Sequence, residues 1–340
     1  MKKFAFLLLI AVLSIGLAAC NSTNNGSSNS TTTKNESSSE QDSSKLNVYT
    51  TVYPLSYFAE RIGGDFVNVS SIYPPGSNEH TYEPTQQDMM SLADADLFFY
   101  IGLGLEGFVE NAQKTLEGEN VKLVAAADYI SDDQLNASAE EEHDHEHEEG
   151  ETHDHDESEG HEGHNHGDID PHVWLSPILA KDLALAVKEE LVASLPEQEV
   201  TFNENYELLI EELDSLDQQF KEMASAAKTK TFFVSHASFG YIAKQYGLEQ
   251  VAIAGINSQS EPSQKELASI VEQAQELNIQ YILFEQNVSS KLSSVIQNEV
   301  GAGTLELHNL SVLTEEDINN NETYFTLMEK NIETFKKALN

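Results

Sequence analysis

Short β-rich runs alternate with helical patterns through most of the chain, and this alternation limits the fold more than any other feature. In the first half, the expected strands are Leu46 to Val52, Phe66 to Ile72 and Asp96 to Ile101. In the second half, they are Thr231 to Ser235, Gln250 to Ile253 and Tyr281 to Phe284. Strands separated by helices are typical of parallel sheets covered by helices. The sequence therefore predicts an α/β protein with two parallel-type sheets.

A long segment without strand character separates the two halves. Between Glu197 and Ala227 apolar residues recur at helical spacing, and neither Gly nor Pro occurs after Pro196. This periodicity is that of an ordinary amphipathic helix. Its position between two α/β halves favours a rigid helix at 197–227 joining an N-terminal domain, residues 46–196, to a C-terminal domain, residues 228–340.

The first 45 residues have the pattern of an export signal and a tether. Two lysines precede an apolar run that ends in small residues, which predicts a signal peptide over residues 1–19. Cys20 is the only cysteine, so an intramolecular disulfide is excluded, and Leu-Ala-Ala-Cys resembles a bacterial lipobox. We expect Cys20 to carry a lipid anchor. Residues 20–45 are polar and should form a flexible tether.

The net charge of -40 argues against nucleic acid and anionic membrane surfaces as partners. Much of this charge lies between Glu140 and His166, where thirteen carboxylates and eight histidines occur without Lys or Arg. This composition predicts a loop at 140–168 that is either a solvated acidic linker or a weak, fast-exchanging metal collector. Its histidines are His143, His145, His147, His153, His155, His161, His164 and His166.

Four residues outside that loop are candidates for a metal site. His80 lies in a loop after a strand, His172 lies just before a helix, and His236 and Glu285 directly follow expected strands. Open α/β sheets bind ligands beyond the carboxyl ends of their strands, so these side chains can converge. Three imidazoles and a carboxylate suit Zn²⁺. His308 also follows an expected strand, but no motif surrounds it, and we interpret it as structural.

Three motifs resemble the metal-binding signatures of the zinc and manganese solute-binding proteins of bacterial ABC importers, most closely the ZnuA/AdcA type. The motifs are His80-Thr81-Tyr82-Glu83-Pro84, Asp170-Pro171-His172-Val173-Trp174-Leu175-Ser176-Pro177 and Ser235-His236-Ala237-Ser238-Phe239-Gly240-Tyr241. The resemblance implies two α/β domains joined by a long helix, with one metal between them. It implies His80, His172 and His236 as ligands.

The resemblance leaves the fourth ligand open among Glu285, Glu79 and water. Manganese-type relatives carry a carboxylate where His236 stands, which favours zinc here because imidazoles suit zinc and carboxylates suit harder ions. It further implies a monomeric, lipid-anchored protein on the outer face of a Gram-positive-like cell membrane, which delivers zinc to an ABC permease. This role is not enzymatic.

Two alternatives from other functional classes stay open at this point. A secreted zinc-dependent hydrolase or lyase would use three histidines and an open fourth position to activate water. The chain has no His-Glu-x-x-His motif, and a carboxylate in the fourth position would close the site. A manganese-type metal-binding protein or adhesin is the other alternative, with function in cell adhesion.

Overall fold

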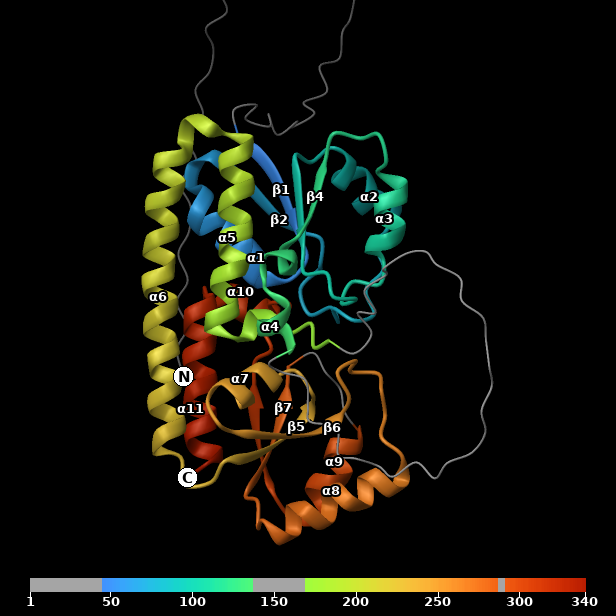
Figure 1. The fold of residues 1–340 in the computed structure, drawn as a ribbon. Helices are drawn as coiled ribbons and strands as arrows, with labels where there is room; N and C mark the ends of the chain where they lie inside the picture. Colours follow the sequence, from blue (N-terminus) through green and yellow to red (C-terminus); the bar gives the residue numbers. More distant parts are fainter. Residues whose placement is uncertain (1–44, 137–168, 287–290) are drawn as a thin grey trace, which may run out of the picture. The chain divides into compact units, whose positions relative to one another are not determined.

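Two parallel four-stranded sheets form the framework of the protein (Figure 1). The computed structural model describes residues 45–136, 169–286 and 291–340. The first sheet has the order β2-β1-β3-β4 and the second has the order β6-β5-β7-β8, with every pairing parallel. The predicted α/β fold with two parallel sheets is confirmed.

The elements up to the long helix belong to the first sheet and its helices. In chain order they are β1 (Leu46–Thr50), α1 (Tyr53–Gly63), η1 (Gly64–Phe66), β2 (Val67–Ser71), α2 (Gln86–Ala93), β3 (Leu97–Tyr100), α3 (Val109–Thr115), β4 (Lys122–Ala125), η2 (Ala126–Tyr129), α4 (Asp132–Leu135), η5 (Val173–Leu175), α5 (Pro177–Ser194) and η6 (Pro196–Gln198). The sequence did not predict β4, a short edge strand that begins with an exposed lysine.

The long helix α6 (Glu199–Ala226) packs against α1 and α5 and against the C-terminal helix α11 (Figure 1). The predicted long helix is therefore confirmed, although it begins two residues later than expected because Pro196–Gln198 forms a separate 3-10 turn. Its buried side is lined by Phe202, Leu209, Leu213, Leu216 and Phe220. Among the described residues, no helix combines the length and apolar character needed to cross a membrane.

The remaining elements build the second sheet and its helices. They are β5 (Thr231–His236), α7 (Gly240–Gln245), β6 (Glu249–Ala254), α8 (Gln264–Glu276), β7 (Tyr281–Glu285), α9 (Lys291–Val300), β8 (Gly303–Leu307), α10 (Glu315–Asn319) and α11 (Tyr324–Ala338). Helix α8 begins with a capping box, in which Ser263 and Glu266 bond each other's backbone N–H groups. Strands β5 and β7 each extend one residue further than predicted, through His236 and Glu285.

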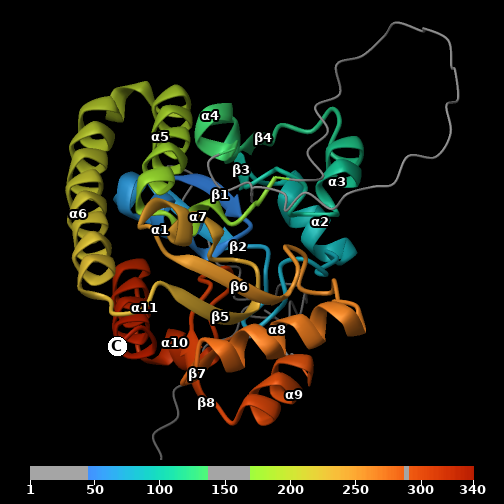
Figure 2. The ribbon, with the colours of Figure 1, turned by 60° about the horizontal axis from the view of Figure 1, so that its bottom comes forward.

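One hydrophobic core is shared by the two sheets. It includes Val48 of β1, Trp174 of η5, and Val234 and Leu283 of the second sheet. A smaller core lies between the second sheet and helices α8 and α9 (Figure 2). The described residues therefore belong to one compact unit, in which both sheets pack against the same core.

Candidate metal centre

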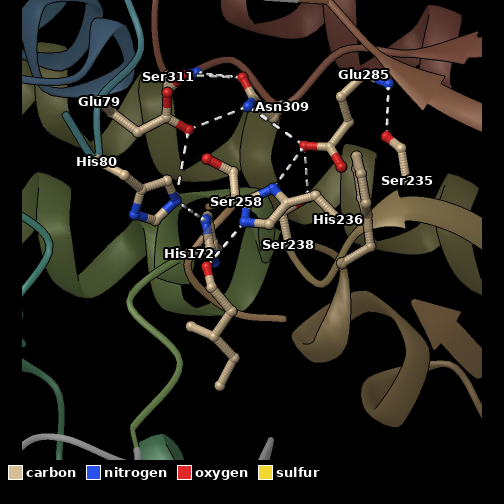
Figure 3. A network of polar contacts seen from close by, with 12 residues as sticks. Glu79, His80, His172, Ser235, His236, Ser238, Ser258, Glu285, Asn309 and Ser311 are labelled. Carbon is tan, nitrogen blue, oxygen red and sulfur yellow. Dashed lines mark hydrogen bonds and ion pairs between the residues drawn. The ribbon is translucent and has the colours of Figure 1, made fainter. Parts of the chain in front are cut away.

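Three histidines from distant parts of the chain meet in the structure (Figure 3). His80 lies between β2 and α2, His172 immediately precedes η5, and His236 is the last residue of β5. One ring nitrogen from each lies within 4.8 Å of the others, and the ring centroids are 4.9 to 5.3 Å apart. The three residues form a group that could hold a metal ion, and because Zn–N bonds are about 2.0–2.1 Å long, the more widely spaced nitrogens must move closer when zinc binds.

The order of strands in the second sheet explains how His236 and Glu285 come together. Strand β5 pairs with β6 on one side and with β7 on the other. The chain therefore adds one strand beside β5 and then crosses to the opposite side of β5 to form β7. Ligands of open α/β sheets bind at the carboxyl ends of the strands at this kind of crossing. His236 ends β5 and Glu285 ends β7, which places both at that point.

The imidazole of His172 is oriented by Asp170. The Asp170 carboxylate accepts a hydrogen bond from the His172 backbone N–H at 2.9 Å, and its Oδ1 lies 2.7 Å from His172 Nδ1. A carboxylate only accepts, so Nδ1 carries a proton, and in the neutral ring Nε2 is then the nitrogen with the lone pair. That Nε2 lies 3.3 Å from His80 Nε2. This arrangement is the outer support commonly found behind metal-binding histidines.

A glycine makes room for this support. A Cβ on Gly240 would lie 2.8 Å from Asp170 Oδ2, closer than real Cβ contacts allow. The neighbouring Tyr241 hydroxyl donates to the Asp170 backbone carbonyl at 2.9 Å. The Gly240-Tyr241 pair at the start of α7 therefore holds Asp170 behind His172.

His236 is fully buried, and both of its ring nitrogens face acceptors. Nδ1 lies 3.1 Å from Glu285 Oε2, and Nε2 lies 2.8 Å from the backbone oxygen of Ile256. Burial by itself lowers the pKa of His236, but the Glu285 carboxylate outweighs it and raises the pKa to about 9. The metal-free imidazole is therefore protonated at neutral pH and donates to both oxygens.

The pKa of His80 is shifted in the opposite direction to that of His236. Burial, together with the nearby imidazoles of His172 and His236, lowers the pKa of His80 to about 3. Its side chain is only 5% exposed. The backbone N–H of His80 donates to Asn78 Oδ1, and Asn78 in turn donates to Ser258 Oγ of the loop after β6. A neutral imidazole with a free lone pair is the form that binds metal.

Two buried carboxylates flank the histidines. Glu285 Oε2 accepts from Ser238 Oγ at 2.9 Å, and Glu79 Oε1 lies 4.0 Å from His80 Nε2. Within the described part of the chain, Glu79 Oε2 and Glu285 Oε1 are buried without a hydrogen-bond partner. Buried charged groups need a partner of opposite charge, so two buried carboxylates beside three imidazoles form a donor set suited to a cation.

The other predicted metal-binding and lipidation residues lie outside the described residues, and His308, which we interpret as structural, lies apart from the cluster. Cys20 and the eight histidines of the acidic loop fall in the segments 1–44 and 137–168, which the structure does not describe. His308 does not join the cluster. Its Nε2 lies 3.1 Å from Asp317 Oδ2, and its Nδ1 accepts from the backbone N–H of Leu310.

Comparison with known proteins identifies the family. The family model for ZnuA, described as "Zinc-uptake complex component A periplasmic", matches residues 48–338. The chain belongs to this family. Its relatives in the ZnuA family include the zinc-binding lipoprotein AdcA of Streptococcus pneumoniae R6, which is 38% identical over 338 residues. That match covers 99% of this chain and 61% of the relative, so the chain spans about three fifths of the length of AdcA.

Two further members of the ZnuA family match over nearly their full length. The high-affinity zinc uptake system protein ZnuA of Bacillus subtilis is 35% identical over 338 residues, covering 99% of this chain and 98% of the relative. The crystal structure of the Zn(II)-bound ZnuA-like domain of Streptococcus pneumoniae AdcA has a TM-score of 0.66 and 35% identity. That likeness covers 87% of this chain and 99% of the domain.

The sequence did not reveal every residue of this centre. Asp170 is part of a recognised motif, but nothing in the sequence alone shows that its carboxylate contacts the ring of His172. Asn309 was missed entirely, although its side chain contacts both Glu79 and Glu285. The only sequence signal for it is its position two residues after β8, at the carboxyl end of a sheet strand.

Proposed function

We propose that this chain captures a zinc ion outside the cell and delivers it to the permease of an ABC importer. The observation that carries this proposal is the buried cluster of His80, His172 and His236 with two buried carboxylates beside it. Zinc prefers three or four nitrogen and oxygen donors in tetrahedral geometry, and imidazole favours it over harder ions. Membership of a zinc-uptake family supports the same conclusion.

The fourth donor that we propose is Glu285. Its Oε2 lies 3.1 Å from a ring nitrogen of His236, whereas Glu79 Oε1 lies 4.0 Å from His80 Nε2. Glu285 also ends a strand of the second sheet, so its backbone is fixed by the ladder with β8. A carboxylate in the fourth position closes the coordination shell. A closed, buried shell suits binding and release and leaves no position for a catalytic water, so we infer that the protein is not an enzyme.

We infer that Cys20 anchors the chain by a lipid on the outer face of the membrane, which keeps the captured zinc close to the permease. A relative that is named a zinc-binding lipoprotein supports this anchor. Labelling cells with a tagged fatty acid tests it, because the label should enter the native chain and not the Cys20→Ala variant.

Zinc competition with a chromogenic chelator tests whether this centre binds zinc tightly while the acidic loop binds it only weakly. We expect the protein lacking residues 140–166 to keep one tightly bound zinc and to lose only weak, additional binding. The reason is that the residues of the histidine cluster are ordered by packing during folding, whereas the loop must lose chain entropy with each ion that it captures.

A second variant separates imidazoles from carboxylates within the loop. Replacing its eight histidines with Asn, while keeping all thirteen carboxylates, should reduce the weak zinc binding nearly as much as the deletion does. Loss of the tight zinc in either variant would show that the loop supplies a primary ligand, and the proposed four-residue site would be wrong.

A further inference from the structure

Asn309 joins the two carboxylates that flank the histidine cluster (Figure 3). Its side-chain amide Nδ2 donates to Glu79 Oε1 at 3.1 Å and to Glu285 Oε2 at 3.3 Å. An amide NH₂ group has two protons, so it can make both hydrogen bonds at once. Glu79 comes from the loop after β2 and Glu285 from the end of β7, so the amide connects acids from the two different sheets.

The orientation of this amide is fixed by its other atoms. Asn309 Oδ1 accepts from the Ser311 backbone N–H at 3.1 Å, from Ser311 Oγ at 2.8 Å and from Gln286 Nε2 at 3.0 Å. A backbone N–H can only donate, so this side of the amide must be oxygen and the other side nitrogen.

The backbone of Asn309 is also held by hydrogen bonds. Its carbonyl oxygen accepts from Trp174 Nε1 at 2.6 Å, and its N–H donates to Gln286 Oε1 at 3.0 Å. The residue is fully buried. An amide that is held by its backbone and by its oxygen presents its two N–H groups to the carboxylates in one fixed direction.

We propose that Asn309 is a positioning residue that sets the preference of this centre for zinc over manganese, an inference that rests on the proposed zinc-binding function. The terminal torsion of a glutamate side chain is broad, so its own conformational energy does not decide how the carboxylate turns. The Asn309 amide holds one oxygen of each acid, and for Glu285 it acts together with Ser238 Oγ and His236 Nδ1. Each acid then turns the oxygen that Asn309 holds toward the histidines, and its second oxygen stays buried without a partner.

This restraint affects metal choice through the number of oxygens that the acids can offer. Four donors in tetrahedral geometry suit zinc, whereas manganese favours octahedral shells rich in oxygen. A carboxylate that is free to turn can bind an ion through both oxygens. By holding one oxygen of each acid, Asn309 limits Glu285 to one oxygen donor and keeps Glu79 out of the four-donor shell, and so disfavours manganese.

Two substitutions remove the amide donor in different ways. Asn309→Asp keeps the size and the Oδ1 acceptor but replaces the N–H donor with a negatively charged oxygen. Asn309→Ser removes the donor without adding charge, because its hydroxyl is too short to occupy the place of the amide. Asn331→Asp is the matched control. Asn331 bonds the backbone of His308, next to Asn309, through its Oδ1 and Nδ2, and it has no hydrogen bond to Glu79 or Glu285 in the structure.

Competition titrations with Zn²⁺ and Mn²⁺ measure the preference, and the visible absorption of the Co²⁺-loaded protein reports the coordination number. We expect both Asn309 variants to lose zinc affinity by about 10- to 100-fold, as is usual for an outer-shell partner. Manganese affinity should fall less or rise, so the zinc-to-manganese ratio should drop by about tenfold or more. The Co²⁺ absorption should weaken, as it does when four-coordinate cobalt gains ligands. Asn331→Asp should keep the ratio and the spectrum.

Circular dichroism establishes that each variant is folded before it is compared. An unchanged metal ratio and an unchanged Co²⁺ spectrum in the two folded Asn309 variants would overturn the positioning role. A reduced ratio in Asn309→Asp alone would overturn it too, because added charge would then explain the effect. The result for Asn309→Ser decides between these outcomes, because that variant removes the donor without adding charge. Failure of the unmodified protein to bind zinc tightly would instead contradict the proposed function.

Discussion

The His172→Ala variant is expected to lose high-affinity zinc binding. His172 is fully buried, its Nε2 lies 3.3 Å from His80 Nε2, and Asp170 holds it in the tautomer that binds metal. Its removal takes one donor from a closed shell, and water held in a small buried space is a poorer replacement. We expect the loss of affinity to exceed the 10- to 100-fold that is typical when an outer-shell partner is removed. Calorimetry in competition with a chelator measures it.

The Asp170→Asn variant should lose less zinc affinity than the His172→Ala variant. The amide keeps the shape of the aspartate but removes the negative charge that fixes the His172 proton on Nδ1, so we expect a loss of about 10- to 100-fold. Lys114→Ala, at an exposed position on α3, should leave zinc affinity unchanged. Equal affinities for His172→Ala and Lys114→Ala would remove His172 from the site.

Zinc affinity is expected to rise with pH up to about pH 9. The pKa of His236 is raised to about 9 because the Glu285 carboxylate outweighs burial. Below that pH, zinc must displace a proton from His236, so each unit of acidification should weaken binding by about tenfold. Above it, the imidazole is already neutral and this contribution disappears. Burial lowers the pKa of His80 to about 3, so His80 stays neutral across the same range.

Proton release during zinc titration in buffers of different ionisation enthalpy measures this dependence. Near pH 7.5, about one proton per zinc should be released from His236, and at pH 10 none should come from it. An ordinary histidine would release few protons at pH 7.5, because its pKa is about 6.5. Replacing Glu285 with Gln should return the pH dependence to that ordinary range. A flat affinity between pH 6 and pH 9 would contradict the protonated state of His236.

The sheets and the long helix could be predicted from the sequence because their signals are local. Compact apolar runs such as Tyr281 to Phe284 are bounded by polar residues, and the helical spacing in α6 continues for many turns without Gly or Pro. The positions of His236 and Glu285 followed from the same signals, because each comes at the end of an apolar run. Parallel strands then bring their carboxyl ends to one edge of the sheet.

The supporting residues could not be predicted because their roles depend on contacts across the fold. Asn309 lies in a segment without a recognised motif, 230 residues from Glu79, and its role depends on where its amide points. Gly240 is part of a motif, but its need for space becomes evident only when Asp170 lies against it. Edge strand β4 is four residues long and begins with an exposed lysine, so its pattern resembles that of a loop.

X-ray absorption at the zinc edge, recorded on the one-to-one zinc complex of the protein lacking residues 140–166, tests the central claim most directly. Three imidazoles from His80, His172 and His236 with one carboxylate oxygen should give four N or O neighbours at about 2.0–2.1 Å, with strong imidazole scattering. The spectrum should lose part of that scattering in the His172→Ala variant. Six oxygen neighbours, or imidazole scattering that the variant leaves unchanged, would contradict a zinc site built from these histidines.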